Sequence, residues 1–280
     1  MISLKRCSGT LANCVTLPAM GRKDFRSFKE VLRSVADRKA AAAKARFAAA
    51  DPTAEKPRDV YVGACEAIAQ TLIPDGFRYL KSRQALDRTV GVFVHRVSFK
   101  SSRNNIPGQS VVMWMYANVQ CKELATWRSR QSTSLRTGDW AAGGMVHLLT
   151  GEHAMIEWQL ADPKSRSAAI ANAQAFSRTV VLGYFKLFED PLRTVAELLK
   201  APINAFSIGD QIEFVLCFAG PREASQVLQR FVDLRSDLHG DMHRAIERVE
   251  RKGLPEYAPT GHADVVAWVH KAYRLEADIG

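Results

Sequence analysis

The stretch VGVFVHRVSF, residues 90–99, decides the fold together with VVMWMYANV, residues 111–119. Both runs are rich in β-branched and aromatic residues, which is typical of strands. The eleven residues between them contain Pro107 and Gly108, so the sequence predicts an antiparallel hairpin with a long loop. In the second strand both faces carry large side chains, and we therefore expect helices to cover the sheet and Trp114 and Tyr116 to lie beneath them.

A second hairpin is predicted from residues 145–149 and 154–160, which flank the turn TGEH at 150–153. The sheet would then have about four antiparallel strands. Residues 127–140 between the two hairpins are polar and basic and predict an exposed loop with solvated arginines. The open alternative is a stacking surface for single-stranded nucleic acid, formed by the loop Lys100–Ser110 together with Arg128, Arg130, Arg136, Trp114, Tyr116 and Trp127.

Helical periodicity dominates the rest of the chain. A helix over residues 60–73 precedes the sheet, and the Asp162-Pro163 pair starts a second half that is helical to the end. Residues 208–218 fit either a helix or a strand, and a helix of about 30 residues is predicted from residue 222 to Gly253. We expect one α+β domain over residues 59–280, with a helix and antiparallel sheet at 59–160 and helices at 161–280.

Positive charge is concentrated before this domain. Residues 1–58 contain 13 Lys and Arg against five Asp and Glu, so they carry +8 of the net charge of +10, and residues 59–280 carry +2 (26 minus 24). Apolar residues recur from Phe25 to Val35 beside a row of basic residues, which predicts an amphipathic basic helix, and an Ala-rich stretch follows. Translation from Met20 instead of Met1 is an alternative for the start of this arm.

Three uses of the basic arm stay open: neutralising nucleic-acid phosphates, resting on an anionic membrane, or forming a solvated, partly helical tail. Its Arg-rich, acid-poor composition also fits an organellar transit peptide. If the arm binds nucleic acid, the candidate side chains are basic and lie in its helical part: Arg26, Lys29, Arg33, Lys39, Lys44 and Arg46.

Cysteine usage and hydropathy bear on location. The five cysteines are odd in number and widely spaced, with no CxxC pair, which favours buried free thiols in the reducing cytoplasm over disulfides or zinc. No apolar run reaches the length of about 18 residues that spans a bilayer, so we expect no integral membrane association.

Two histidines have the spacing of metal ligands. His239 and His243 are four residues apart on a predicted helix, with Asp241 between them. The HExxH glutamate is missing and no third ligand is identifiable, so ordinary hydrogen bonds and ion pairs at the helix boundary are the expected role. His95 shares a strand face with Phe93 and Val97, which predicts a buried histidine with satisfied hydrogen bonds.

Several hydrophobic motifs resemble one family. The helix running into IPDGF at 73–77, the strands at 92–99 and 111–119, and the helix reaching VLGYFKLF at 181–188 are similar to a DUF4304-like bacterial domain of unknown function. The resemblance covers roughly residues 60–200 and departs in the arm and the C-terminal helices. It implies an antiparallel sheet with helices and a stand-alone bacterial cytoplasmic protein, with some members neutralising toxins or acting as interaction proteins, and it transfers no catalytic residue.

The chain contains no GxSxG, P-loop or GxGxxG sequence and no Cys-His pair with a family signature. We therefore expect a non-enzymatic module that binds another protein, resembling an immunity or antitoxin protein, without cofactor or metal. Nucleic-acid binding through the basic arm is the alternative function. A metal-dependent enzyme that uses His239 and His243 is the second alternative.

Overall fold

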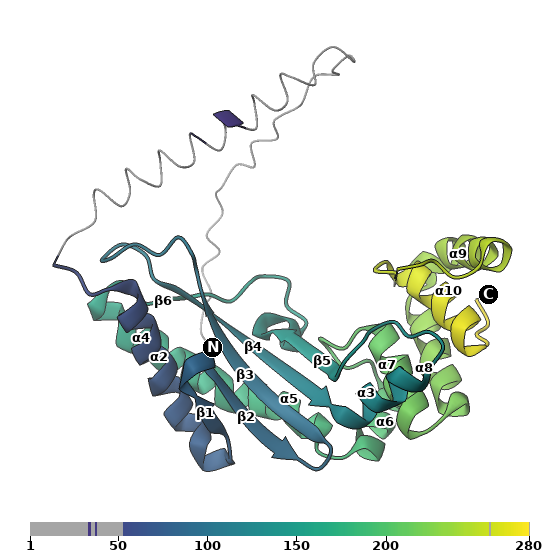
Figure 1. The fold of residues 1–280 in the computed structure, drawn as a ribbon, viewed down its shortest axis with the longest axis horizontal. Coiled ribbons are helices and arrows are strands. Elements are labelled where there is room, and N and C mark those ends of the chain that lie inside the picture. The colour runs from purple at the N-terminus through teal and green to yellow at the C-terminus, as the bar shows by residue number, and fades with distance from the viewer. Residues whose placement is uncertain (1–32, 35–36, 38–52, 258, 280) are drawn as a thin grey trace, which may run out of the picture. The chain divides into compact units, whose positions relative to one another are not determined.

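The computed structural model describes residues 33–34, 37, 53–257 and 259–279 (Figure 1). The chain divides into two compact units, residues 1–49 and 50–280. All but three of the described residues belong to the second unit. None of the helices that the structure describes combines the length and the apolar composition needed to cross a bilayer.

An antiparallel sheet forms the centre of this unit, with strand order β1-β2-β3-β4-β5. A short strand β6 (Trp158–Gln159) pairs with the start of β4, at Val112 and Met113. The predicted α+β class with an antiparallel sheet and a helical C-terminal half is confirmed. The five strands of the main path are β1 (Arg78–Leu80), β2 (Ala85–Val90), β3 (Phe93–Ser101), β4 (Val112–Cys121) and β5 (Trp140–Met145).

The predicted hairpin of residues 90–99 and 111–119 is present as β3 and β4, which pair from Phe93↔Cys121 to Ser101↔Met113. The second predicted hairpin is wrong. Residues 146–150 form the 3-10 helix η3 (Val146–Thr150), which ends at Gly151 with φ 75°. The segment after η3 therefore does not pair with β5, and β6 pairs with β4 instead.

Three helices pack on the buried face of the sheet: α2 (Pro57–Leu72), α4 (Pro163–Phe176) and α5 (Leu182–Phe185). In Figure 1 α5 is drawn behind the strands, and α2 and α4 are drawn at their left. Asp162 caps α4, because its carboxylate accepts a hydrogen bond from the Lys164 amide. A π-helical segment, η4 (Ser177–Val181), joins α4 to α5. These helices cover the apolar face of the sheet, and the main core lies between them.

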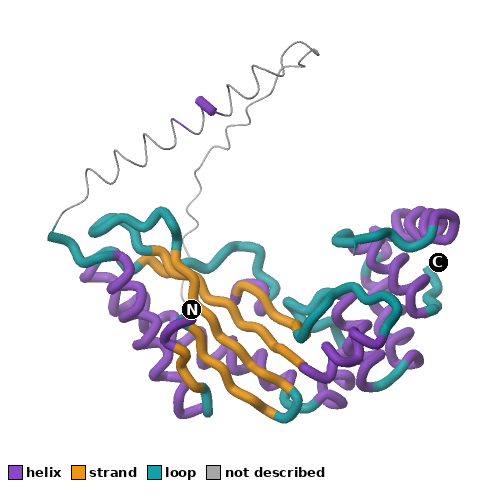
Figure 2. The backbone as a smooth tube through the Cα atoms, viewed as in Figure 1, coloured by secondary structure: helices purple, strands orange, loops and turns teal. Residues whose placement is uncertain are grey.

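The remaining helices gather at one end of the sheet in Figure 2. Residues 208–218 form a helix, which settles the choice that periodicity left open, and Ser207 caps it through the Asp210 amide. These helices are α3 (Lys122–Arg130), α6 (Pro191–Lys200), α7 (Ile208–Phe218), α8 (Pro221–Leu234), α9 (His239–Lys252) and α10 (His262–Tyr273).

The single helix of about 30 residues predicted from residue 222 to Gly253 is wrong. It is divided into α8 and α9 at Arg235, whose φ of −120° and ψ of 44° are not helical. The Arg235 guanidinium donates two hydrogen bonds to the Asp237 carboxylate, at 2.8 and 2.9 Å, across the short 3-10 turn η6 (Ser236–Leu238). The apolar spacing continues across this break, so periodicity alone does not reveal it. Gly253 ends α9 as predicted.

Candidate functional site: the open face of the sheet

Strand alternation gives the sheet two different faces. Along β3 the buried residues Phe93, His95 and Val97 alternate with the half-buried residues Val94 and Arg96. The same alternation runs along β4, where buried positions from Met113 onward alternate with half-buried ones. One face is therefore core and the other is accessible.

The buried face contacts the helices. The Phe93 ring packs against Phe188 and Phe214, with ring centroids 6.2 and 6.0 Å apart. The Ser177 hydroxyl in η4 lies 3.4 Å from the Met115 sulfur. Figure 1 shows the labelled helix α5 on this side of the strands. The core is thus built from the inward-facing half of each strand.

The opposite face has no helix packed on its centre within the part of the chain that the structure describes. Its large apolar residues are half-buried and lie outside the core cluster, whereas the small Ala85 is buried. We call this surface the open face and define it by the following side chains: Arg78, Leu80, Asp87, Val94, Arg96, Ser98, Lys100, Trp114, Tyr116, Asn118, Gln120 and Met145.

The expectation that Trp114 and Tyr116 lie beneath helices is wrong. Both are half-buried and belong to the open face. Large side chains on both faces of a strand indicated a covered sheet, but Trp114 and Tyr116 also carry a polar group on the ring, which suits a partly exposed position. The Trp114 indole, for example, donates to the exposed Glu157 carboxylate at 2.8 Å.

Strand register brings the apolar residues of the open face together. Leu80 on β1 pairs with Ala85 on β2, and Ser98 on β3 pairs with Tyr116 on β4. Tyr116 in turn pairs with Met145 on β5. Because directly opposed residues in an antiparallel sheet lie about 5 Å apart, these side chains form one row across the strands. Trp114 lies two positions along β4 from that row.

Charges on the open face are paired at its centre and exposed at its rim. Arg96 donates two hydrogen bonds to Asp87, at 2.7 and 2.6 Å, and these bonds raise the pKa of Arg96 above its usual range. Arg78 and Lys100 are exposed at the margins. The open face therefore has an apolar row, a neutralised ion pair beside it and basic side chains at its edge.

The candidate residues of the basic arm fall mostly outside the described residues. Arg33 is helical and exposed. The structure does not describe the other five, and the use of the arm stays a prediction: Arg26, Lys29, Lys39, Lys44 and Arg46.

His239 is the first residue of α9 and His243 lies one turn later, because the predicted long helix is divided before them. The His239 ring nitrogen Nε2 is 3.0 Å from the Val232 carbonyl oxygen and is used for that hydrogen bond. Among the described residues, no three His, Cys, Asp or Glu side chains are grouped so that they could share a metal ion.

Arg128 is buried, which corrects the prediction of solvated arginines over residues 127–140. Residues 122–130 form α3 instead of a loop, and Arg128 points into the protein with 1% of its side chain exposed. It donates to Glu213 at 2.6 Å and to Asp210 at 3.0 Å. Sequence pattern alone could not reveal these partners, because they lie more than 80 residues away in α7.

His95 has the buried, hydrogen-bonded role that the sequence predicts. Its Nε2 is 2.8 Å from the Phe188 carbonyl oxygen and its Nδ1 is 3.1 Å from the Arg88 guanidinium. This geometry assigns the proton to Nε2 and leaves Nδ1 as an acceptor. Burial lowers the pKa of His95 to about 4.

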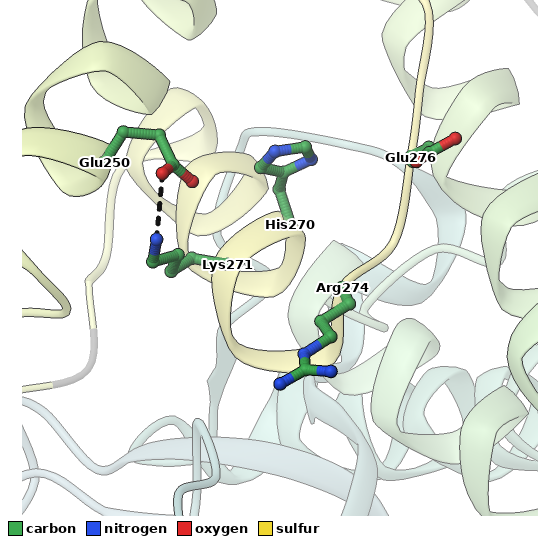
Figure 3. Close-up of a pocket in the computed structure, with 5 residues that line it drawn as sticks. All are labelled: Glu250, His270, Lys271, Arg274 and Glu276. Atoms are coloured by element: carbon green, nitrogen blue, oxygen red, sulfur yellow. Dashed lines mark hydrogen bonds and ion pairs between the residues drawn. The ribbon is translucent and has the colours of Figure 1, made fainter.

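A surface pocket of about 380 Å³ lies near the C-terminus, with Lys271 directed at Glu250 in Figure 3. Those two side chains form an ion pair at 2.8 Å. The lining also contains Arg274 and Glu276, so acidic and basic groups are balanced. No motif in the sequence marked these residues, and their mixed charge favours no one class of ligand.

Comparison with protein-family models, with curated proteins and with solved structures finds no match. The resemblance to a DUF4304-like bacterial domain therefore stays a prediction.

Proposed function

We propose that the protein is a non-enzymatic binding module that docks another protein on the open face of its sheet. The observation that carries the proposal is the row of Tyr116 and Met145, with Trp114 beside it, on a sheet face with no described helix packed on its centre. Aromatic residues, Met and Arg are enriched in protein interfaces, whereas a sheet face of a monomer more often has polar residues.

The size of the open face supports a protein partner. Five strands spaced about 4.8 Å apart make a surface about 19 Å wide. The nine residues of β3 make this surface about 30 Å long, so its area is about 600 Å². A standard protein interface buries about 800 Å² on each partner, so the open face with its flanking loops is large enough.

The charges favour a protein over nucleic acid at this face. Arg96 is already neutralised by Asp87, and Trp114 is bonded to Glu157, so the centre offers no free cation to a phosphate backbone within the described residues. The exposed Arg78 and Lys100 lie at the rim. The partner that fits is a protein surface with apolar side chains at its centre and acidic residues around them.

The proposal is tested by affinity purification of the tagged full-length chain from its native host. We expect one protein to be recovered with the wild type and lost with the double variant Trp114→Ala and Tyr116→Ala. The matched control is Tyr257→Ala, because Tyr257 is 77% exposed and lies outside the open face. Titration of the purified partner should give a Kd weakened at least tenfold by the double variant, since buried aromatic anchors are worth about 2 kcal/mol or more.

Two results would contradict docking on this face. The first is a partner that binds the double variant as tightly as the wild type. The second is recovery that disappears on nuclease treatment, which would assign the surface to nucleic acid.

A second candidate function, nucleic-acid binding through the basic arm, is favoured by the charge of +8 within residues 1–58. Removal of residues 1–49 is the test, because Glu55 pairs with Arg166 in α4 at 2.6 Å and a longer deletion would disturb the folded unit. We expect the full chain to bind a mixed-sequence DNA duplex with an affinity that falls steeply with salt, and the shortened chain to lose that binding. Arm-independent or salt-insensitive binding would contradict this function.

A further inference from the structure

A separate cavity of about 310 Å³ lies at the free edge of β5. Its walls come from the segment before β5, from β5 itself and from the segment leading into α7. Arg136 and Trp140 line it and also line an adjoining cavity of about 450 Å³. Cavities of this size hold small molecules.

Arg136 is held in a defined orientation at the wall of this cavity. Its Nε lies 2.9 and 3.0 Å from the two carboxylate oxygens of Asp210. The Arg136 side chain is 51% exposed, whereas that of Asp210 is 3% exposed. Within the described part of the chain, the two terminal amino groups of Arg136 and the indole N–H of Trp140 have no hydrogen-bond partner. Three or more donors are therefore free at this site.

Asp210 is itself immobilised, so the orientation of Arg136 is built into the fold. The Ser207 hydroxyl donates to Asp210 at 2.6 Å, and Arg128 Nη2 donates to it at 3.0 Å. Arg128 is in turn bound to the buried Glu213. The carboxylate oxygens of Asp210 are occupied by these donors, which leaves hydrogen-bond donors as the free polar groups that face the cavity.

Strained backbone forms the floor. Gly143 has φ 117° and Ala205 has φ 53°, and the Gly143 amide donates to the Ala205 carbonyl at 2.7 Å. A Cβ at Gly143 would lie 2.1 Å from the Ala117 carbonyl oxygen, so only glycine fits there. Strained residues fixed by the surrounding fold are concentrated at ligand sites. Gly143, Ala205 and Phe206 form the apolar part of the cavity lining, which we call its floor.

We propose that this cavity binds a small monocarboxylate that has an apolar body. A guanidinium anchored through Nε presents its remaining nitrogens to a carboxylate in a planar arrangement. Trp140 adds an indole N–H donor and a ring for stacking. The terminal nitrogens of Arg136 can donate two hydrogen bonds to one carboxylate, whereas a phosphate dianion would require further cations that the lining does not contain.

The test uses the full chain with phenylacetate as the probe, followed by the Trp140 indole N–H signal in a ¹H–¹⁵N NMR titration. Phenylacetamide has the same shape without the charge, and inorganic phosphate tests for general anion binding. We expect saturable binding of phenylacetate, at least tenfold weaker binding of phenylacetamide, and no shift with phosphate. Arg136→Gln should weaken phenylacetate binding at least tenfold, whereas Arg130→Gln, at an exposed arginine that ends α3, should not change it.

The amide signals of α7 report whether Arg136→Gln keeps its fold, and Arg136→Lys keeps the charge without the planar fork. We expect Arg136→Lys to weaken binding as well. The proposal is overturned if phenylacetate gives no saturable shift of the Trp140 signal, if phenylacetamide binds equally well, if phosphate competes at the same concentration, or if folded Arg136→Gln binds like the wild type.

Discussion

Arg128 and Glu213 form a buried ion pair that joins α3 to α7. Arg128 Nε donates to Glu213 at 2.6 Å, and the two side chains are 1% and 0% exposed. The other Glu213 oxygen accepts from the Leu135 amide at 2.5 Å and from the Tyr273 hydroxyl at 2.8 Å. Four segments, namely α3, the segment before β5, α7 and α10, therefore meet at one carboxylate, and the orientation of Arg136 depends on the same cluster through Asp210.

Glu213→Gln should lower the free energy of unfolding by about 3–5 kcal/mol, because Arg128 would be left buried without its full counter-charge. Urea denaturation followed by circular dichroism measures the change. Glu197→Gln is the matched control, since the Glu197–Lys200 pair is exposed and worth less than about 1 kcal/mol. Equal effects of the two substitutions would contradict the role assigned to Glu213.

His95 should make stability depend on pH. Its pKa in the folded protein is lowered to about 4 from 6.5, so the unfolded chain binds more protons between these values. The free energy of unfolding is therefore highest above pH 6.5 and falls by about 3 kcal/mol as the pH drops to 4. His95→Gln should remove most of this pH dependence. A parallel decline in wild type and variant would show that other groups cause it.

Gly143→Ala should be strongly destabilising, because its φ of 117° and the 2.1 Å approach to Ala117 leave no room for a Cβ. We expect a loss of about 2–4 kcal/mol in urea denaturation. Gly183 lies inside α5, and a methyl group added there would have no neighbouring atom within 4 Å, so Gly183→Ala should instead stabilise by about 0.5–1 kcal/mol. A well-tolerated Gly143→Ala would show that the floor of the cavity is less constrained than described.

Two of the three cysteines of the folded unit, Cys65 and Cys121, should react slowly. Cys65 and Cys121 are buried, and burial raises the pKa of the two thiols to about 12 and about 11. In a variant in which Cys7, Cys14 and Cys217 are replaced by Ser, a thiol reagent at pH 7.5 should label Cys65 and Cys121 only after urea is added. Rapid labelling of native Cys121 would be inconsistent with its burial.

The elements with strong local patterns could be predicted from the sequence. The β3–β4 hairpin follows from alternation in residues 90–99 and 111–119, and the start of α4 follows from Asp162 and Pro163. The buried position of His95 follows from its apolar neighbours on the strand face. Such features depend on a few adjacent residues, which is why the sequence reveals them.

The candidate sites depend on contacts that are distant in the chain. The polar neighbours of Arg128 predict a solvated side chain, yet its partners Asp210 and Glu213 come from α7. Trp114 and Tyr116 have a strand pattern, but which face the helices cover is decided by tertiary packing. The outward-facing residues of β4 end in two polar residues, Asn118 and Gln120. This polar end of the strand is the local sign in the sequence that this face is open.

The central claim is that the open face docks a protein, and site-specific photo-crosslinking in the native host tests it most directly. p-Benzoylphenylalanine replaces Tyr116 in one variant and the exposed Tyr257 in the control. Docking on the open face predicts one discrete protein adduct at position 116 and none of that mass at position 257. An adduct with nucleic acid at position 116, the same adducts at both positions, or no adduct at position 116 would contradict it.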